Sequence, residues 1–241
     1  MKKMILAFIL VLAATGMQLK AQNVVYDANA EVRKVESFKG IEVSGGISVY
    51  LSQGKEQAVA VSVDEQKYIS KVRTEVRNGI LKIYVESGGW NSWNWGNRKV
   101  KAYVTVSTLE SLELSGASSM KISGDVNITD LKAEVTGASS LKGSFKGNSM
   151  KLETSGASVA TLEGSINSLS MEVSGASVVK AYDLTTANCN VDASGASSVS
   201  VTATKELKME ASGASSIGYK GDAAIKKIDV SGASTVRKRD S

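Results

Sequence analysis

The chain has 241 residues, no histidine, no proline and one cysteine, and its net charge is +5 at pH 7. The missing histidines remove the commonest general base and a common metal ligand, and the lone Cys189 excludes an intrachain disulfide. The absence of proline is typical of a fold whose strands have hydrogen-bonded neighbours on both sides, because proline cannot donate to a β-ladder.

Residues 1–21 have the pattern of a secretory signal peptide: two lysines, an apolar run over 4–14 and the small residue Ala21. The run is too short for a membrane anchor, and no later stretch would serve as a transmembrane helix. We therefore expect an exported protein in the periplasm, on the outer-membrane surface or outside the cell. Cleavage removes three lysines and no acid, so the net charge falls from +5 to +2. Only 237–239 is then a basic cluster, and nucleic acid is not an expected partner.

Residues 22–108 are predicted to form an irregular N-terminal β region that starts or caps the repeats. A helical turn is indicated at 64–69, and Asn78-Gly79 is a hairpin signal because both turn positions tolerate positive φ. The expected strands are 38–43, 47–51, 58–63, 72–76, 80–85 and 100–106.

A polar, glycine-rich stretch between the last two of these strands holds all three tryptophans of the chain. They are Trp90, Trp93 and Trp95, with Asn91 and Asn94 between them. Indole faces stack on sugar rings, and asparagine amides supply donors and acceptors to hydroxyl groups, so the stretch is a candidate glycan-binding site. The alternative is structural, since a solenoid needs its exposed end covered and the rings would cap it or pack between protomers.

From residue 109 to 238 the chain consists of seven copies of one short unit. Each copy contains the tetrapeptide Ser-Gly-Ala-Ser, with one Thr variant, and successive motif glycines are 21, 19, 19, 20, 18 and 19 residues apart. A sustained period near 19 indicates that one unit is stacked on itself, and the glycine allows a backbone corner. The motif glycines are Gly116, Gly137, Gly156, Gly175, Gly195, Gly213 and Gly232.

Mostly apolar residues occupy alternate positions on both sides of each motif glycine. In one copy Met150, Leu152 and the small Thr154 precede Gly156, and Ala160 follows it. Spacing by two marks the buried face of a strand. About 19 residues are enough for one turn of a parallel β-helix and far too few for a βαβ unit. The repeats therefore predict an all-β parallel β-helix of seven coils, with 22–241 as one domain overall.

An acidic residue stands three positions before every motif glycine, and a lysine stands two positions earlier in four copies. Stacked like charges repel, and rows of lysine would offset the repulsion. A Ca²⁺ stripe or a catalytic carboxylate pair is the alternative, but calcium needs six to eight oxygens and a glycosidase pair needs unlike environments. We expect neither a metal nor a cofactor. The acids are Glu113, Glu134, Glu153, Glu172, Asp192, Glu210 and Asp229.

The many serines show no catalytic pattern. The chain has no histidine to activate them and no GxSxG elbow. A Ser–Lys arrangement stays open as an alternative. The repeated motif is not a phosphate loop, because it lacks GK[ST] and a following helix.

Three features together resemble the head GIN domain family of autotransporter adhesins, exported proteins of Gram-negative bacteria. They are the segments 43–49 and 76–83 and the iterated motif with its preceding acid. The resemblance covers roughly 35–238; the Gly-Ile-Asn that names the family is Gly46-Ile47-Ser48 here. It implies a right-handed β-helix and an adhesin role, and carries over no catalytic residue.

We expect a non-enzymatic, exported binding or adhesion protein of the bacterial envelope that contacts a glycan or another surface. The expected ligand residues are those of the tryptophan stretch, with Tyr50, Tyr84 and Tyr103 as weaker neighbours. One alternative is a polysaccharide-processing enzyme on a β-helix scaffold. Another is a purely structural envelope protein that self-associates end to end as a homo-oligomer.

Overall fold

The structure, a computed structural model, describes residues 27–86 and 99–239. The predicted signal peptide and the tryptophan stretch with Trp90, Asn91, Trp93, Asn94 and Trp95 lie outside the described residues.

The described chain is almost entirely β and contains one short 3₁₀ helix, η1 (Gln66–Lys71). The strands are β1 (Glu31–Arg33), β2 (Gly40–Val43), β3 (Ile47–Gln53), β4 (Ala58–Val63), β5 (Val72–Arg77), β6 (Ile80–Val85), β7 (Val100–Val106), β8 (Ser111–Leu114), β9 (Ser119–Val135), β10 (Ser140–Thr154), β11 (Val159–Val173), β12 (Val178–Ala193), β13 (Ser198–Ala211), β14 (Ser216–Lys220), β15 (Ala224–Val230) and β16 (Thr235–Lys238).

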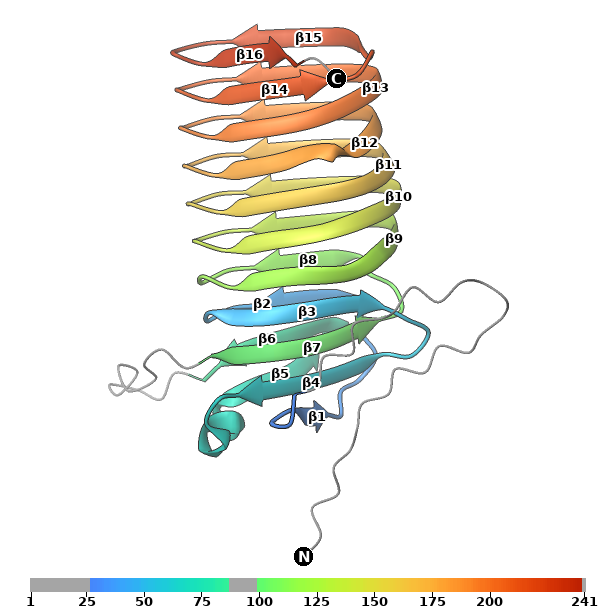
Figure 1. The fold of residues 1–241 in the computed structure, drawn as a ribbon, viewed down its shortest axis with the longest axis vertical. Helices are drawn as coiled ribbons and strands as arrows, with labels where there is room; N and C mark the ends of the chain where they lie inside the picture. The colour runs from blue at the N-terminus through green and yellow to red at the C-terminus, as the bar shows by residue number, and fades with distance from the viewer. Residues whose placement is uncertain (1–26, 87–98, 240–241) are drawn as a thin grey trace, which may run out of the picture.

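The strands stack into a right-handed β-solenoid, as predicted. As the chain climbs in Figure 1, front strands such as β14 run to the right and back strands such as β15 run to the left. Each of the long strands β9 to β13 supplies a front segment, bends at the right-hand edge and continues as a back segment. Neighbouring coils pair in parallel and in register, so that Leu141 of β10 lies between Met120 of β9 and Ala160 of β11.

The Ser-Gly-Ala-Ser motifs form the corner at which each back strand turns into the next front strand. Gly156 has φ +75°, a conformation that favours glycine. The backbone N–H of the next residue, Ala157, donates a 2.7 Å hydrogen bond to the carbonyl oxygen of Gly137, one coil below. An added Cβ at Gly156 would lie 2.4 Å from that same carbonyl oxygen. The corner therefore requires glycine both for its φ and for the close approach of the coil beneath it.

The N-terminal region stacks on the repeats out of sequence order. The pair β2–β3 lies directly beneath β8–β9, and the later pair β6–β7 lies beneath β2–β3, all in parallel. Beyond β6–β7 the strands become antiparallel: β5 pairs with β6, β4 with β7, and β1 with β4. These strands and η1 close the N-terminal end of the stack (Figure 1).

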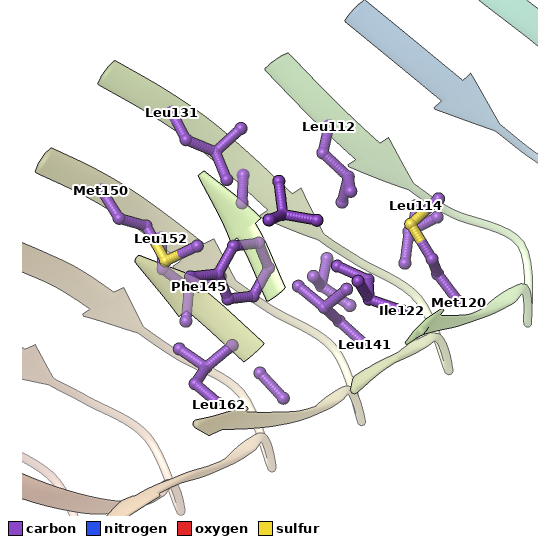
Figure 2. Packing of buried hydrophobic residues seen from close by; sticks show 14 of the residues in the cluster. Leu112, Leu114, Met120, Ile122, Leu131, Leu141, Phe145, Met150, Leu152 and Leu162 are labelled. Carbon is purple, nitrogen blue, oxygen red and sulfur yellow. The ribbon is translucent and has the colours of Figure 1, made fainter. Parts of the chain in front are cut away.

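The core is one continuous apolar cluster that runs through the solenoid between its front and back sheets. Figure 2 shows Leu131 and Met150, which are register partners on the back strands, and Phe145, which projects between the sheets. Residues in the same column touch their counterparts in the coils above and below. The burial of apolar side chains in such columns is the main stabilising term of the fold.

Candidate functional site

The tryptophan stretch connects two strands that belong to the same coil. Strands β6 and β7 are joined by residues 86–99, whereas β8 and β9 are joined by the four residues 115–118. The described ends are fixed by pairing, because Ile83 of β6 lies beside Val43 and Val100 of β7 lies beside Ile47. A long segment on a rigid sheet corner is a common place for a binding loop. Nothing in the described residues tests whether Trp90 and its neighbours bind a ligand, and that expectation stays a prediction.

Two of the three candidate tyrosines lie together. Tyr50 of β3 and Tyr103 of β7 are register partners, and their rings stack with centroids 5.4 Å apart and planes 16° apart. Both rings are half-buried on the outer face of the front sheet, within a few residues of the Val100 end of the tryptophan stretch. The pair is an aromatic platform that sequence spacing did not reveal, because it arises from pairing across 53 positions.

Asp27 holds one end of this platform in place. The Tyr103 hydroxyl donates a 2.8 Å hydrogen bond to Asp27 Oδ2, and Lys101 Nζ lies 3.6 Å from the same oxygen. Burial acts to raise the pKa of Asp27, but hydrogen bonds from Tyr103, Asn29 and Ser62 and the charge of Lys101 together lower it below its ordinary value. Burial and the bond to Asp27 raise the pKa of Tyr103. Tyr103 is therefore a neutral phenol whose hydroxyl is held by a carboxylate. Such a ring is better suited to binding a ligand than to transferring a proton.

Tyr84 does not belong to this group. It lies on β6, in the back sheet, and its hydroxyl donates to Glu75 Oε1 at 3.1 Å. That bond raises the pKa of Tyr84. Tyr84 therefore ties the hairpin formed by β5 and β6 together and is separated from Tyr50 and Tyr103 by the apolar core.

The acidic residues form an unbroken column along the back sheet. Register places Glu153 between Glu134 and Glu172, and Glu42 of β2 extends the column beyond the repeats. Lysines bridge its members: Lys151 Nζ lies 3.0 Å from both Glu153 and Glu172. The hydrogen bond from Lys151 lowers the pKa of Glu153. The column is a lattice of ion pairs, and each exposed pair is worth only about 0–1 kcal/mol.

Glu113 is the exception within the column. Burial raises its pKa, and the neighbouring carboxylates of Glu42 and Glu134 raise it further, while Lys82 and Lys132 act in the opposite direction. Lys82 donates its hydrogen bond to Glu42 at 2.5 Å, and in the described ranges no cation forms an ion pair with Glu113. Among residues 27–86 and 99–239 no three acidic or cysteine side chains are grouped closely enough to hold a metal ion.

Cys189 is buried in the core, where burial raises the pKa of its thiol to about 12. A thiol with that pKa is not a thiolate at neutral pH, so Cys189 acts as a small apolar residue. No helix in the described part of the chain has the length and apolar character needed to cross a membrane.

Comparisons with known proteins agree with this architecture. A family model described as "Putative auto-transporter adhesin, head GIN domain" matches residues 37–223. A crystal structure described as "a putative adhesin" from Bacteroides fragilis is similar over 87% of this chain and 96% of its own, at 18% identity and a TM-score of 0.80. A "Putative lipid binding protein" from Parabacteroides distasonis is similar over 88% and 97%, at 24% identity and a TM-score of 0.66. At such identities the likeness concerns the fold alone. Among curated proteins nothing matches.

Proposed function

Since the chain belongs to the auto-transporter adhesin family with a head GIN domain, we propose that it is an exported, non-enzymatic binding protein of the Gram-negative cell envelope that contacts glycans. The family and its fold support an adhesin-like binding role. Export to the Gram-negative envelope, glycans as the ligand class and the residues that bind them are the parts that we propose. The ligand surface is formed by Trp90, Trp93 and Trp95, with Asn91 and Asn94, beside the tyrosine platform of Tyr50 and Tyr103.

The observation that supports this surface is that residues 86–99 connect β6 to β7, and β7 carries Tyr103 of the stacked aromatic pair. A segment of this length is not needed to turn the corner, because four residues do so between β8 and β9. Aromatic faces next to amide and hydroxyl groups match the alternating apolar and polar faces of a sugar ring. The rigid sheet beneath the platform reduces the ordering cost of binding.

A glycan and extracellular-matrix array with the purified protein tests the proposal. The triple substitution of Trp90, Trp93 and Trp95 by Ala should abolish binding while changing the melting temperature by less than about 3 °C, since a ligand loop does not support the core. Tyr84→Ala is the matched aromatic control and should keep binding. A large fall in melting temperature for the triple variant would instead support a capping role, and absence of glycan binding by the parent protein would refute the proposal.

A second candidate function, end-to-end self-association, is favoured by the C-terminal end of the solenoid. Three apolar residues of β15 are register partners of buried residues of β13 yet are 43–46% exposed: Ile225, Ile228 and Val230. No described strand covers the outer edge of β15 or β16. Uncovered ends of solenoids and exposed strand edges favour association. Sedimentation at several protein concentrations tests this: a mass that rises with concentration, and that Ile228→Lys returns to one chain, supports self-association, whereas a constant single-chain mass excludes it.

An enzymatic role is not part of the proposal. A carboxylate pair that cleaves polysaccharides needs two acids in unlike environments inside a cleft. The acids of the column lie along a sheet face, and lysines such as Lys151 contact them from rung to rung. Turnover of any polysaccharide by the purified protein would overturn this part.

A further inference from the structure

A bulge in β12 places Tyr182 outside the regular ladder. Ala181 pairs with Val201 of β13, but the next pair is Thr185 with Thr202, so residues 182–184 have no register partner on β13. The Thr202 hydroxyl donates to the carbonyl oxygen of Tyr182 at 2.8 Å and holds the bulge. Bulges commonly redirect a side chain, and often lie next to functional sites.

The redirected ring lies along the outer face of the front sheet and reaches Gly218 of β14. An added Cβ at Gly218 would be 2.3 Å from the Tyr182 hydroxyl oxygen. The backbone of Gly218 is not in the left-handed region, so its conformation does not require glycine. The other residues that pair in parallel along the same register row all have a side chain: Tyr103, Tyr50, Lys121, Lys142, Thr161, Lys180, Ser200 and Arg237. Gly218 is therefore the point at which the row is opened to admit the tyrosine.

A pocket of about 110 Å³ lies beside this contact. Hydroxyl groups of neighbouring coils line its floor, and the Thr235 hydroxyl is 3.3 Å from that of Ser216. Pockets for whole small molecules usually measure about 300–1,000 Å³. This pocket has room for one polar group of a larger ligand rather than for a complete sugar or nucleotide. Its side chains are those of Tyr182, Ser198, Ser200, Ser216, Thr235, Arg237 and Arg239.

Among the described residues, the charged groups that line the pocket are all cations. Arg237 and Arg239 line it, and Lys220 Nζ lies 5.1 Å from the centre of the Tyr182 ring. Within the described ranges none of these three forms an ion pair with a carboxylate, whereas Lys227 on the back face of the last coil is paired with Glu210 at 2.7 Å. Guanidinium groups beside hydroxyl donors match the planar and tetrahedral oxygens of oxyanions.

We propose that this pocket binds a sulfate or phosphate ester group, held by Arg237 and Arg239 with the hydroxyls of Ser200, Ser216 and Thr235. The site lies at the opposite end of the solenoid from β6 and β7, the two strands that the tryptophan stretch connects. It neither requires glycan binding there nor follows from it. An ester group carried on a saccharide and one carried on a lipid headgroup share this chemistry, and the choice of probe separates them.

Calorimetric titration of the purified protein with dextran sulfate, uncharged dextran and inorganic phosphate tests the site, and flotation with phosphatidylglycerol vesicles tests the lipid source. The double variant Arg237→Ala/Arg239→Ala should weaken anion binding at least tenfold, because both charge-assisted contacts are lost. The matched control Lys205→Ala/Lys208→Ala removes the same charge from exposed positions of β13 away from the pocket and should change affinity less than threefold.

Gly218→Ser separates a built pocket from diffuse attraction, because it keeps every cation but fills the space beside Tyr182. It should also weaken binding at least threefold at an unchanged melting temperature. Equal losses in the two double variants, unchanged binding in Gly218→Ser, or no anion binding by the parent protein would overturn the proposal. The tryptophan triple variant should keep anion binding, so failure of the glycan proposal and failure of this one give different results.

Discussion

At the N-terminal end of the solenoid the antiparallel strands β4 and β1 lie outside the last parallel rung, whereas at the C-terminal end the parallel strands β15 and β16 are themselves outermost. The consequence is visible in burial. Val61 of β4 is fully buried, whereas Val230 of β15 is 43% exposed. The N-terminal strands do not repeat one another in sequence, because each of them has different neighbours in the stack. The C-terminal coils repeat the interior pattern up to the edge, so residues suited to a core remain exposed there.

The largest expected effect comes from truncating an isoleucine at each end. Ile83→Ala, at a fully buried site in β6, should lower the free energy of unfolding by about 2–5 kcal/mol, because it opens a cavity. Ile228→Ala, at a site 46% exposed in β15, should cost about 1 kcal/mol or less. Urea unfolding midpoints of the two variants measure the difference. Similar midpoints would mean that another chain or segment covers the C-terminal end.

Alanine at a corner glycine should have a smaller effect, and one that depends on the coil. Gly45→Ala, at φ +86° with the nearest atom of the described residues 3.6 Å from the added Cβ, should cost about 1–2 kcal/mol of backbone strain. Gly156→Ala adds to that strain a contact of 2.4 Å with the Gly137 carbonyl oxygen, so we expect a cost greater by at least about 1 kcal/mol. Thermal melts of both variants decide this. Equal costs would show that coils separate freely at the corner.

The repeats could be predicted from the sequence, because the repeat length and the buried face of each strand follow from residues that are close together in the chain. The position of Gly156 and the alternation of Leu152 and Thr154 fix the corner and the inward face, and the structure confirms the β-solenoid. The insertion of β2–β3 between β6–β7 and β8–β9 could not be read, because all of these strands satisfy the same periodicity and nothing local fixes their order. The same limit concealed the Tyr50–Tyr103 stack, which depends on that order.

The pocket at Tyr182 shows a second limit of the repeat pattern. Aligning the coils on their glycines ignores small differences in coil length. Tyr182 leaves the ladder in a coil whose motif glycines are 20 residues apart, at residues 182–184. Gly218, in turn, has no positive φ to explain it. The bulge at Tyr182 and the glycine at position 218 are far apart in the sequence, and their contact becomes apparent only when the coils are stacked.

The smallest expected effects concern the acidic column, which runs between the two ends of the solenoid. They are shifts in melting temperature whose sign differs between members of the column. The pKa of Glu113 is raised in the folded protein, so its contribution to stability is complete below the ordinary glutamate pKa and is lost as pH rises through the folded value. Glu113→Gln should therefore raise the melting temperature at pH 7 by about 1–2 °C. The gain should vanish near pH 3, where the parent carboxyl is already protonated.

Glu153 should respond in the opposite direction. Its pKa is lowered by the hydrogen bond from Lys151, so its stabilising contribution is present above the ordinary pKa and is lost as pH falls through the folded value. Glu153→Gln should lower the melting temperature at pH 7 by about 1–2 °C and have a smaller effect near pH 3, because the parent carboxylate gains a proton as pH falls. Calorimetric melts at both pH values compare the two variants. Shifts of the same sign at pH 7 would mean that net charge, rather than the local arrangement of Lys82, Lys132 and Lys151, determines the stability of the column.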